Sequence, residues 1–149
     1  MALDDDIAIL ASSPLFGLMT RDALRLIGFA AERRSLAPEA VLFERGDPAD
    51  GAYVVLHGTI RLDPRLPGTP PVEAGPATLI GRIALFLPQE RPTTARAASA
   101  AEVMVIPRAL MRRVLEVFPD AAAAIHDALA EDLASLTQDL TRLRVARPD

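Results

Sequence analysis

The spacing of apolar residues predicts two helices at the start of the chain. Apolar positions recur every three or four residues in 3–13 and again in 20–31, which is the period of an amphipathic helix. Thr20 precedes the second segment and has the side chain of a helix N-cap. The stretch SSPLFG between them is typical of a turn, and we expect it to bury Leu15 and Phe16.

The helical period returns at the end of the chain. It runs through 108–118, directly after Pro107, and Pro119 starts a longer helix that ends near Val145, because proline suits the first turn of a helix. Leucines on this last helix follow a spacing close to a heptad. These leucines are Leu129, Leu133, Leu136, Leu140 and Leu143. We predict that this seam packs on a second copy of the chain; the alternatives are its own β unit or another protein.

The middle of the chain, 34–107, has the pattern of a β unit. Short apolar and β-branched stretches alternate with clusters of Gly, Pro and Asp at intervals of roughly ten residues, which indicates a barrel or a sandwich. The predicted strands lie within 35–43, 52–62, 77–80 and 93–106. Gly58, inside one of them, marks a bend. The segment 64–71 is a loop, because its four prolines cannot join a sheet interior.

Composition limits the chemistry that the chain can perform. Its 149 residues fit one domain, and its formal net charge of -4 argues against broad, salt-driven binding to nucleic acid. All sixteen basic residues are arginine, which excludes Schiff-base and phosphate-loop lysines. The absence of cysteine excludes disulfides, thiol nucleophiles and thiolate metal sites.

No sequence pattern indicates catalysis, a metal site or a membrane segment. His57 and His126 lie on different predicted elements, and nothing clusters with them at metal-ligand spacing. No acid–base or nucleophile set is visible, so we predict that the chain is not an enzyme. The acidic start lacks the positive region of a signal peptide, and no apolar run approaches the ~20 residues that span a bilayer. We therefore expect a cytoplasmic protein without membrane contact.

Two stretches carry a resemblance to a known family. They are RGDPADGAYVVLHGTIRL at 45–62 and LIGRIALFLPQERPTTARA at 79–97, and AEVMVIPRALMRRVLEVFP follows them at 101–119. In order and spacing they resemble the cyclic nucleotide-binding domain of the catabolite-activator and fumarate–nitrate-regulator superfamily. The resemblance covers nearly the whole chain.

The resemblance implies an α+β fold that is mainly β, with an antiparallel β-roll or jelly roll flanked by N-terminal helices and a long C-terminal helix. The chain 1–149 would then be one domain. The N-terminal helices would occupy 1–33, the β-roll 34–107 with a phosphate-binding cassette at 79–97, and the C-terminal helices 108–146.

The same resemblance implies a ligand site in the cassette. Arg91 matches the family's phosphate-binding arginine, which makes charge-assisted bonds to phosphate oxygens. The other matching positions are Gly81, Ile83, Ala84, Thr93 and Thr94. The implied regulatory ligand is a cyclic nucleotide such as cAMP or cGMP. From the residues alone, Arg91 is either an anion clamp or a structural arginine paired with an acid.

Two residues in the cassette depart from the family pattern. Arg82 stands where the family has a glutamate that accepts a hydrogen bond from a ribose hydroxyl. Pro92 stands where the family has a small residue whose backbone N–H can donate a hydrogen bond. Proline has no such donor. Arg82 therefore either turns outward, or the pocket holds a ligand more anionic than a cyclic monophosphate.

Two functional hypotheses follow from the resemblance. The first is a regulatory or sensor module that binds a nucleotide or a small anion in the β-roll and relays binding through its C-terminal helix. The second is a degenerate domain that no longer binds cyclic nucleotide and serves as a dimerising or partner-binding scaffold. In both cases we expect a homodimer through the C-terminal helix. Because the chain ends at Asp149, without the family's DNA-reading domain, we expect no direct DNA binding.

Overall fold

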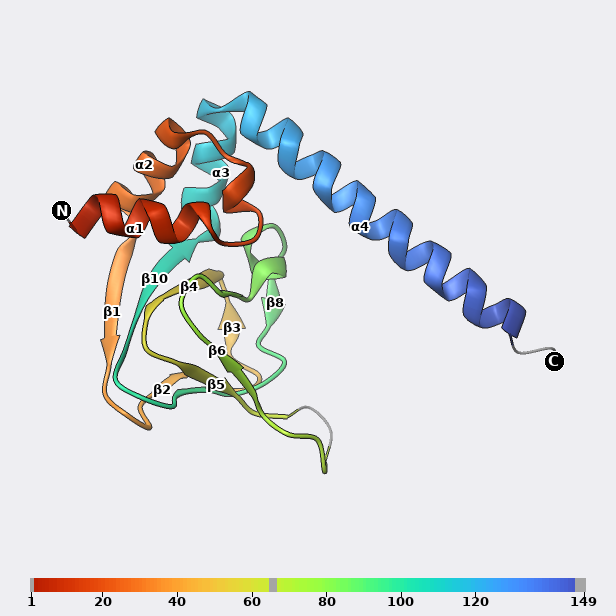
Figure 1. The fold of residues 1–149 in the computed structure, drawn as a ribbon, viewed down its shortest axis with the longest axis horizontal. Coiled ribbons are helices and arrows are strands. Elements are labelled where there is room, and N and C mark those ends of the chain that lie inside the picture. Colours follow the sequence, from red (N-terminus) through yellow and green to blue (C-terminus); the bar gives the residue numbers. More distant parts are fainter. Residues whose placement is uncertain (1, 65–66, 147–149) are drawn as a thin grey trace.

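The computed structural model describes residues 2–64 and 67–146, except for the side chains of residues 2, 132, 135–137 and 139–146. Helices lie at both ends of the chain and all the strands lie between them (Figure 1). The helices are α1 (Ala2–Ala11), η1 (Phe16–Leu18), α2 (Arg21–Ala30), η2 (Arg82–Leu85), α3 (Arg108–Val117) and α4 (Pro119–Ala146). The strands are β1 (Glu32–Leu36), β2 (Val41–Phe43), β3 (Pro48–Ala49), β4 (Gly51–His57), β5 (Ile60–Leu62), β6 (Val72–Ala74), β7 (Leu79–Ile80), β8 (Gln89–Glu90), β9 (Ala95–Ala97) and β10 (Ala101–Pro107). This order confirms the predicted α+β class.

The strands form a two-sheet roll. One sheet has the order β1-β10-β4-β7, the other has the order β2-β9-β5-β6, and β3 pairs with β8 in a separate ribbon. Every pairing is antiparallel. Apolar residues from both four-stranded sheets fill the interior of the roll. The predicted β-roll is therefore confirmed.

Strand β10 separates two apolar cores. Val103 and Val105 pack with the interior of the roll, whereas Met104 and Ile106 pack with the N-terminal and C-terminal helices. This division follows from the alternation of successive side chains between the two faces of a strand. The sheet that contains β10 thus has the roll interior on one face and helices on the other (Figure 1).

The N-terminal helices pack as their apolar pattern predicted. The Thr20 side chain accepts a hydrogen bond from the Ala23 N–H at 3.3 Å, which confirms it as the N-cap of α2. Leu15 and Phe16 are buried in the turn between α1 and α2. These helices close the outer face of the β1-β10-β4-β7 sheet.

Three short strands were not predicted from the sequence. β3, β6 and β8 contain two or three residues each, too few to show an alternating pattern. β3 begins with Pro48, which an isolated two-stranded ribbon tolerates because one edge of each strand needs no ladder bond. The β3–β8 ribbon ends at Glu90, directly before Arg91.

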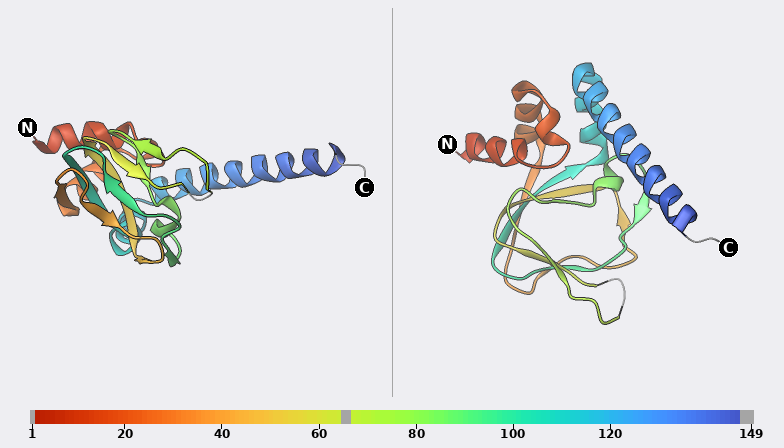
Figure 2. Two further views of the ribbon diagram at one scale, coloured as in Figure 1. Left: turned by 90° about the horizontal axis from the view of Figure 1, so that it is seen from below. Right: turned by 45° about the vertical axis from the view of Figure 1, so that its right-hand side comes forward.

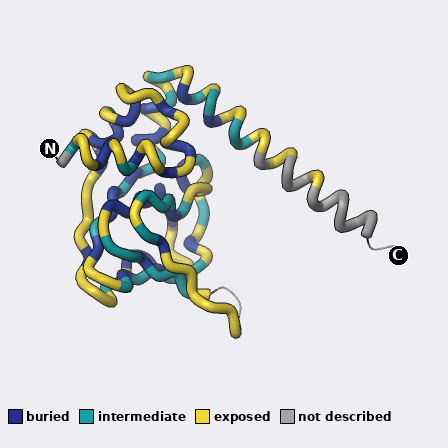
Figure 3. The backbone as a smooth tube through the Cα atoms, in the orientation of Figure 1, coloured by how far each residue is buried: buried dark blue, intermediate teal, exposed yellow. Residues whose placement is uncertain are grey.

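Helix α4 leaves the other helices and extends beyond the roll as a single arm (Figures 1 and 2). Burial decreases along its described part (Figure 3). Leu129 packs on the apolar core between the β1-β10-β4-β7 sheet and the helices, while Leu133 is 65% exposed. Leu136, Leu140 and Leu143 lie outside the described side chains. The dimer seam therefore stays a prediction, and Leu129 has a partner within its own chain.

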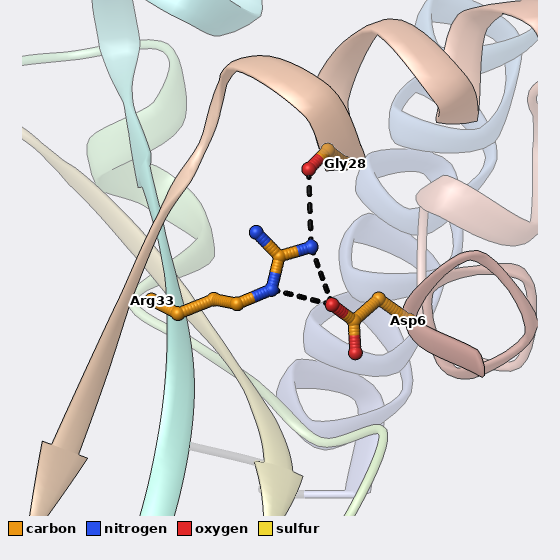
Figure 4. Close-up of polar contacts among 3 residues, drawn as sticks. All are labelled: Asp6, Gly28 and Arg33. Atoms are coloured by element: carbon orange, nitrogen blue, oxygen red, sulfur yellow. Dashed lines mark hydrogen bonds and ion pairs between the residues drawn. The ribbon is translucent and has the colours of Figure 1, made fainter. Parts of the chain in front are cut away.

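A buried ion pair joins α1 to the start of the roll. Asp6 on α1 is buried, and its Oδ2 accepts from the Nε and Nη2 of Arg33 on β1 (Figure 4). Arg33 Nη2 also donates to the Gly28 carbonyl at 3.1 Å, near the end of α2 where helix carbonyls lack intrahelical partners. One guanidinium thus links three elements.

We expect Asp6→Ala to lower the free energy of unfolding by about 2 kcal/mol, because it removes a charge-assisted bond and leaves a half-buried guanidinium unpaired. The measurement is urea unfolding of Asp6→Ala, Arg33→Ala and the double variant. The double variant should lose less than the sum of the single losses. Asp4→Ala is the matched control, since Asp4 pairs with Arg21 at 3.8 Å on the surface and should cost about 0.5 kcal/mol or less. Equal losses for Asp4→Ala and Asp6→Ala would contradict this assignment.

Candidate anion-binding site

The backbone of Arg91 is held by the turn that precedes β3. The Arg91 N–H donates to the Asp47 carbonyl at 2.8 Å, and the Gly46 N–H donates to the Arg91 carbonyl at 2.9 Å. Asp47 Oδ2 in turn accepts from the Glu44 N–H at 2.9 Å. These bonds fix the position at which the Arg91 side chain enters the roll.

The side chain of Arg91 is buried, with only 3% of the residue exposed. Its Nη2 donates to the Gly51 carbonyl at 2.8 Å. Its guanidinium carbon lies 4.6 Å from the ring centre of Phe43 and 5.2 Å from that of Tyr53. The two rings are stacked, with centres 5.8 Å apart, so the cation is stabilised by two aromatic side chains.

The second terminal nitrogen of Arg91 has no hydrogen-bond partner among the residues that the structure describes. Nη1 is buried, and no group among the described residues accepts a bond from it. No carboxylate of those residues forms an ion pair with Arg91, so the structure does not show the alternative of a structural arginine paired with an acid. A buried donor of this kind carries a desolvation cost of about 1–3 kcal/mol.

A cavity of about 260 Å³ opens beside Arg91. Its lining residues are Phe43, Leu62, Ile80, Gly81, Arg82, Ile83, Gln89, Arg91, Pro92 and Thr93. This lining contains two guanidinium groups and no carboxylate, and most of its remaining residues are apolar. Such a lining favours an anionic ligand with an apolar portion.

Gly81 lies directly against the Arg91 guanidinium. It precedes η2 with φ of 83° and ψ of 35°, a left-handed conformation that glycine adopts without strain. A Cβ at this position would lie 2.5 Å from Arg91 Nη1. Gly81 is therefore required both by the backbone angle and by the close approach of the arginine.

Six of the eight predicted cassette residues line the cavity: Gly81, Arg82, Ile83, Arg91, Pro92 and Thr93. Arg82 and Pro92 are exposed at its rim. The Thr93 hydroxyl donates to the Asp63 carbonyl at 2.8 Å and is already engaged.

The other two predicted cassette residues are not among the lining residues. Ala84 is fully buried on η2. The Thr94 hydroxyl accepts from the Arg45 N–H at 3.0 Å, so it supports the turn around Gly46. Ala84 is absent from the lining because it is buried in the core, and Thr94 because its hydroxyl is bonded to the turn.

Sequence reasoning missed the aromatic pair around Arg91, Phe43 and Tyr53, and three further lining residues, Leu62, Ile80 and Gln89. Phe43 and Tyr53 lie on β2 and β4, in different sheets, and neither is near Arg91 in the sequence. The available signal was their rarity, because Tyr53 is the single tyrosine of a chain with 4% aromatic residues.

Other classes of site find no support in the described residues. Within 2–64 and 67–146, no group of three or more His, Asp or Glu side chains is placed to hold a metal ion. No helix in the same part of the chain combines the length and the hydropathy that a bilayer span requires.

Comparison with known proteins identifies similar folds. A family model described as the cyclic nucleotide-binding domain matches residues 33–117, more than half of the chain. The N-terminal domain of a transcriptional regulator from Streptomyces coelicolor A3(2) is 27% identical, with a TM-score of 0.81 over 89% of this chain and 94% of that one. A cyclic nucleotide-binding-like protein from Brucella abortus is 40% identical, with a TM-score of 0.66 over 76% of this chain and 99% of that one.

A larger enzyme contains a similar segment. Lysophospholipase NTE1 of Chaetomium globosum is 28% identical over 116 residues, which cover 76% of this chain and 8% of the enzyme. The chain thus spans less than a tenth of that relative's length.

Proposed function

We propose, because the chain belongs to the cyclic nucleotide-binding domain family, that it is a regulatory module whose β-roll binds a nucleotide or another small phosphorylated anion at Arg91. The single observation that carries this proposal is the buried Arg91 Nη1, which has no hydrogen-bond partner in the described part of the chain and belongs to a side chain that lines a cavity of about 260 Å³. Membership of the family confirms the resemblance read from the sequence.

The energetics of Arg91 support an anionic ligand. A buried cation with an unsatisfied donor lowers the stability of the empty protein. A phosphate oxygen within reach of Nη1 supplies both the missing acceptor and an opposite charge, and such charge-assisted bonds are stronger than neutral ones. Binding of the anion therefore forms a hydrogen bond at Nη1 that the empty protein lacks, and this bond stabilises the complex.

The lining of the cavity indicates which part of a nucleotide is recognised. Among the described lining residues, Arg82 and Arg91 are the charged groups and no carboxylate is present to accept a ribose hydroxyl. Recognition then rests on the phosphate and on apolar contact, for example with Leu62 and Ile80. We infer that cAMP and cGMP are candidate ligands and that the ribose 2′-hydroxyl contributes little to their affinity.

Binding is relayed, in this proposal, through α3 to α4. Residue Gly51, whose carbonyl accepts from Arg91, also approaches the end of β10 closely, and α3 follows β10 without a gap. A relay requires that the ligand bind two arrangements of these elements with different affinity. The long α4, with its leucine seam, is proposed to dimerise and to carry the output.

Isothermal titration calorimetry with cAMP, cGMP, cyclic dinucleotides and inorganic phosphate tests the proposed function. We expect at least one of them to bind and to raise the melting temperature, because a ligand specific for the native state stabilises it. We also expect 2′-deoxy-cAMP to bind within about threefold of cAMP, less than the effect of one net hydrogen bond. No heat and no change in melting temperature with any of these compounds would instead favour the degenerate scaffold.

A further inference from the structure

The Arg91 guanidinium is covered by the cassette in this structure. Gly81 lies against Nη1, and η2 follows Gly81 directly. Arg91 lines the cavity, but its Nη1 is buried, so a direct bond from Nη1 to an anion requires a local shift of the groups around it. Gly81 is one of these groups, because a Cβ there would lie 2.5 Å from Nη1. What holds η2 in place therefore sets the cost of binding.

The Arg108 side chain bonds to η2 and to the segment that follows it. Arg108 is the first residue of α3, and its Nε donates to the Ala84 carbonyl of η2 at 3.0 Å. Its Nη2 donates to the Leu87 carbonyl, two residues beyond η2, at 3.3 Å and to the Ala49 carbonyl of β3 at 2.7 Å. A single guanidinium thus links α3 to the cassette and to the β3–β8 ribbon.

The same arginine is connected to Arg91 through three consecutive carbonyls. Ala49 O accepts from Arg108 Nη2, and Asp50 O accepts from the Arg108 N–H at 2.6 Å. Gly51 O accepts from Arg91 Nη2 at 2.8 Å. Gly51 also packs closely on the end of β10, because a Cβ there would lie 2.2 Å from the Ile106 carbonyl. Because both arginines bond to this one short segment, we expect displacement of one arginine to alter the position of the other.

We propose that Arg108 is a positioning residue that latches η2 over Arg91, and that its release couples anion binding to movement of α3 and α4. This inference rests on the proposed function, because it takes the anion site at Arg91 as given. Anion entry displaces Gly81 and η2, which breaks the bonds from Arg108 to the Ala84 and Leu87 carbonyls. The start of α3 then loses its contacts with the cassette.

If Arg108 is a latch, removal of its side chain should change the affinity for cAMP in the direction opposite to that expected for a purely structural arginine. If Arg108 only stabilised the fold, its removal would weaken ligand binding or leave it unchanged. If it favours the closed state, its removal raises the fraction of molecules that are competent to bind, and apparent affinity rises with that fraction. We expect Arg108→Ala to bind cAMP at least about fivefold more tightly, the effect of one net hydrogen bond.

Calorimetry with cAMP compares the wild type, Arg108→Ala, Arg108→Gln and Arg112→Ala. Arg112 is the matched control: it is exposed one turn later on α3 and lines a surface pocket together with Arg108 and Phe86. In the described part of the chain it makes no bond to the Ala84 or Leu87 carbonyl. Arg112→Ala should bind as the wild type does. Arg108→Gln retains a long polar side chain, and it replaces Arg108→Ala as the test variant if the alanine variant fails to fold.

Two further readouts separate the latch from the ligand site. In hydrogen–deuterium exchange without ligand, Arg108→Ala should speed exchange at residues 82–87 at least about fivefold, whereas Arg112→Ala should not. The chain has no cysteine, so spin labels at Val72→Cys on β6 and Ala134→Cys on α4 report one distance. Saturating cAMP should shift this distance in the wild type, and Arg108→Ala should abolish the shift.

The possible failures are distinguishable. Exchange at 82–87 that is the same in Arg108→Ala and the wild type overturns the latch, whatever the ligand does. Binding of cAMP that is unchanged or weaker in a folded Arg108 variant also overturns it. A wild type that binds none of the probes, but whose cassette exchanges faster in Arg108→Ala, overturns the proposed function and the coupling while the latch itself stands.

Discussion

Arg91→Met is expected to weaken binding of cAMP by about 30-fold or more while leaving the ligand-free protein within about 1 kcal/mol of the wild type. Loss of a buried charged partner typically costs 2–5 kcal/mol of binding free energy, which is about 30-fold or more in the dissociation constant. Stability changes little because two effects oppose each other. The variant loses the bond to Gly51 and the contacts with Phe43 and Tyr53, but it also removes a buried cation with an unsatisfied donor.

The measurements are calorimetry for binding and urea unfolding for stability. Arg34→Met is the matched control, because Arg34 is an exposed arginine 5.8 Å from the ring centre of the same Tyr53 and does not line the cavity. It should bind cAMP as the wild type does. A fall of 3 kcal/mol or more in the stability of Arg91→Met would instead identify Arg91 as a structural residue.

Gly81→Ala is expected to lower the free energy of unfolding by about 3 kcal/mol and to abolish binding. A left-handed conformation costs a non-glycine residue about 1–2 kcal/mol. The new Cβ would also lie 2.5 Å from Arg91 Nη1, which forces the guanidinium away from Gly51 and costs about 1.5 kcal/mol more. The steric term displaces the guanidinium that is proposed to bind the anion, so binding is lost together with stability.

Gly68→Ala separates the two terms. Gly68 has the same φ of 83°, but a Cβ there would meet nothing within 4 Å. The control should therefore lose only the conformational term, about 1–2 kcal/mol, and should retain binding. Urea unfolding and calorimetry on both variants provide the comparison. Equal losses of stability in the two variants would show that Gly81 does not cover Arg91.

Features that depend on near neighbours in the sequence were predictable. Thr20 caps α2, and Pro119 begins α4, because both effects act within one helical turn. The glycine, the short apolar segment and the arginine within 79–97 could be recognised together because they are near neighbours in the sequence, and six of the eight residues named there line the cavity. That this segment is a phosphate-binding cassette stays a prediction. Which of these residues line the cavity and which support the surrounding turns could not be predicted. For example, the Thr94 hydroxyl accepts from the Arg45 N–H, 49 residues away in the sequence.

Features that depend on distant contacts needed the structure. Phe43, Tyr53 and Arg91 meet because strands from two sheets converge, and no local pattern encodes that convergence. Arg108 reads in the sequence as an ordinary residue of an amphipathic helix. Its role depends on carbonyls at Ala49 and Ala84, and backbone acceptors carry no signature in the sequence.

The central claim is that the Arg91 guanidinium is an anion-binding group, and side-chain NMR of the arginines tests it most directly. The chain has sixteen arginines and no lysine, and the Nε signal of Arg91 is the one that disappears in Arg91→Met. On titration with cAMP, the account predicts that this signal shifts in a saturable manner while that of Arg34 stays in place. An Arg91 signal that does not move, under conditions where calorimetry detects bound cAMP, would contradict it.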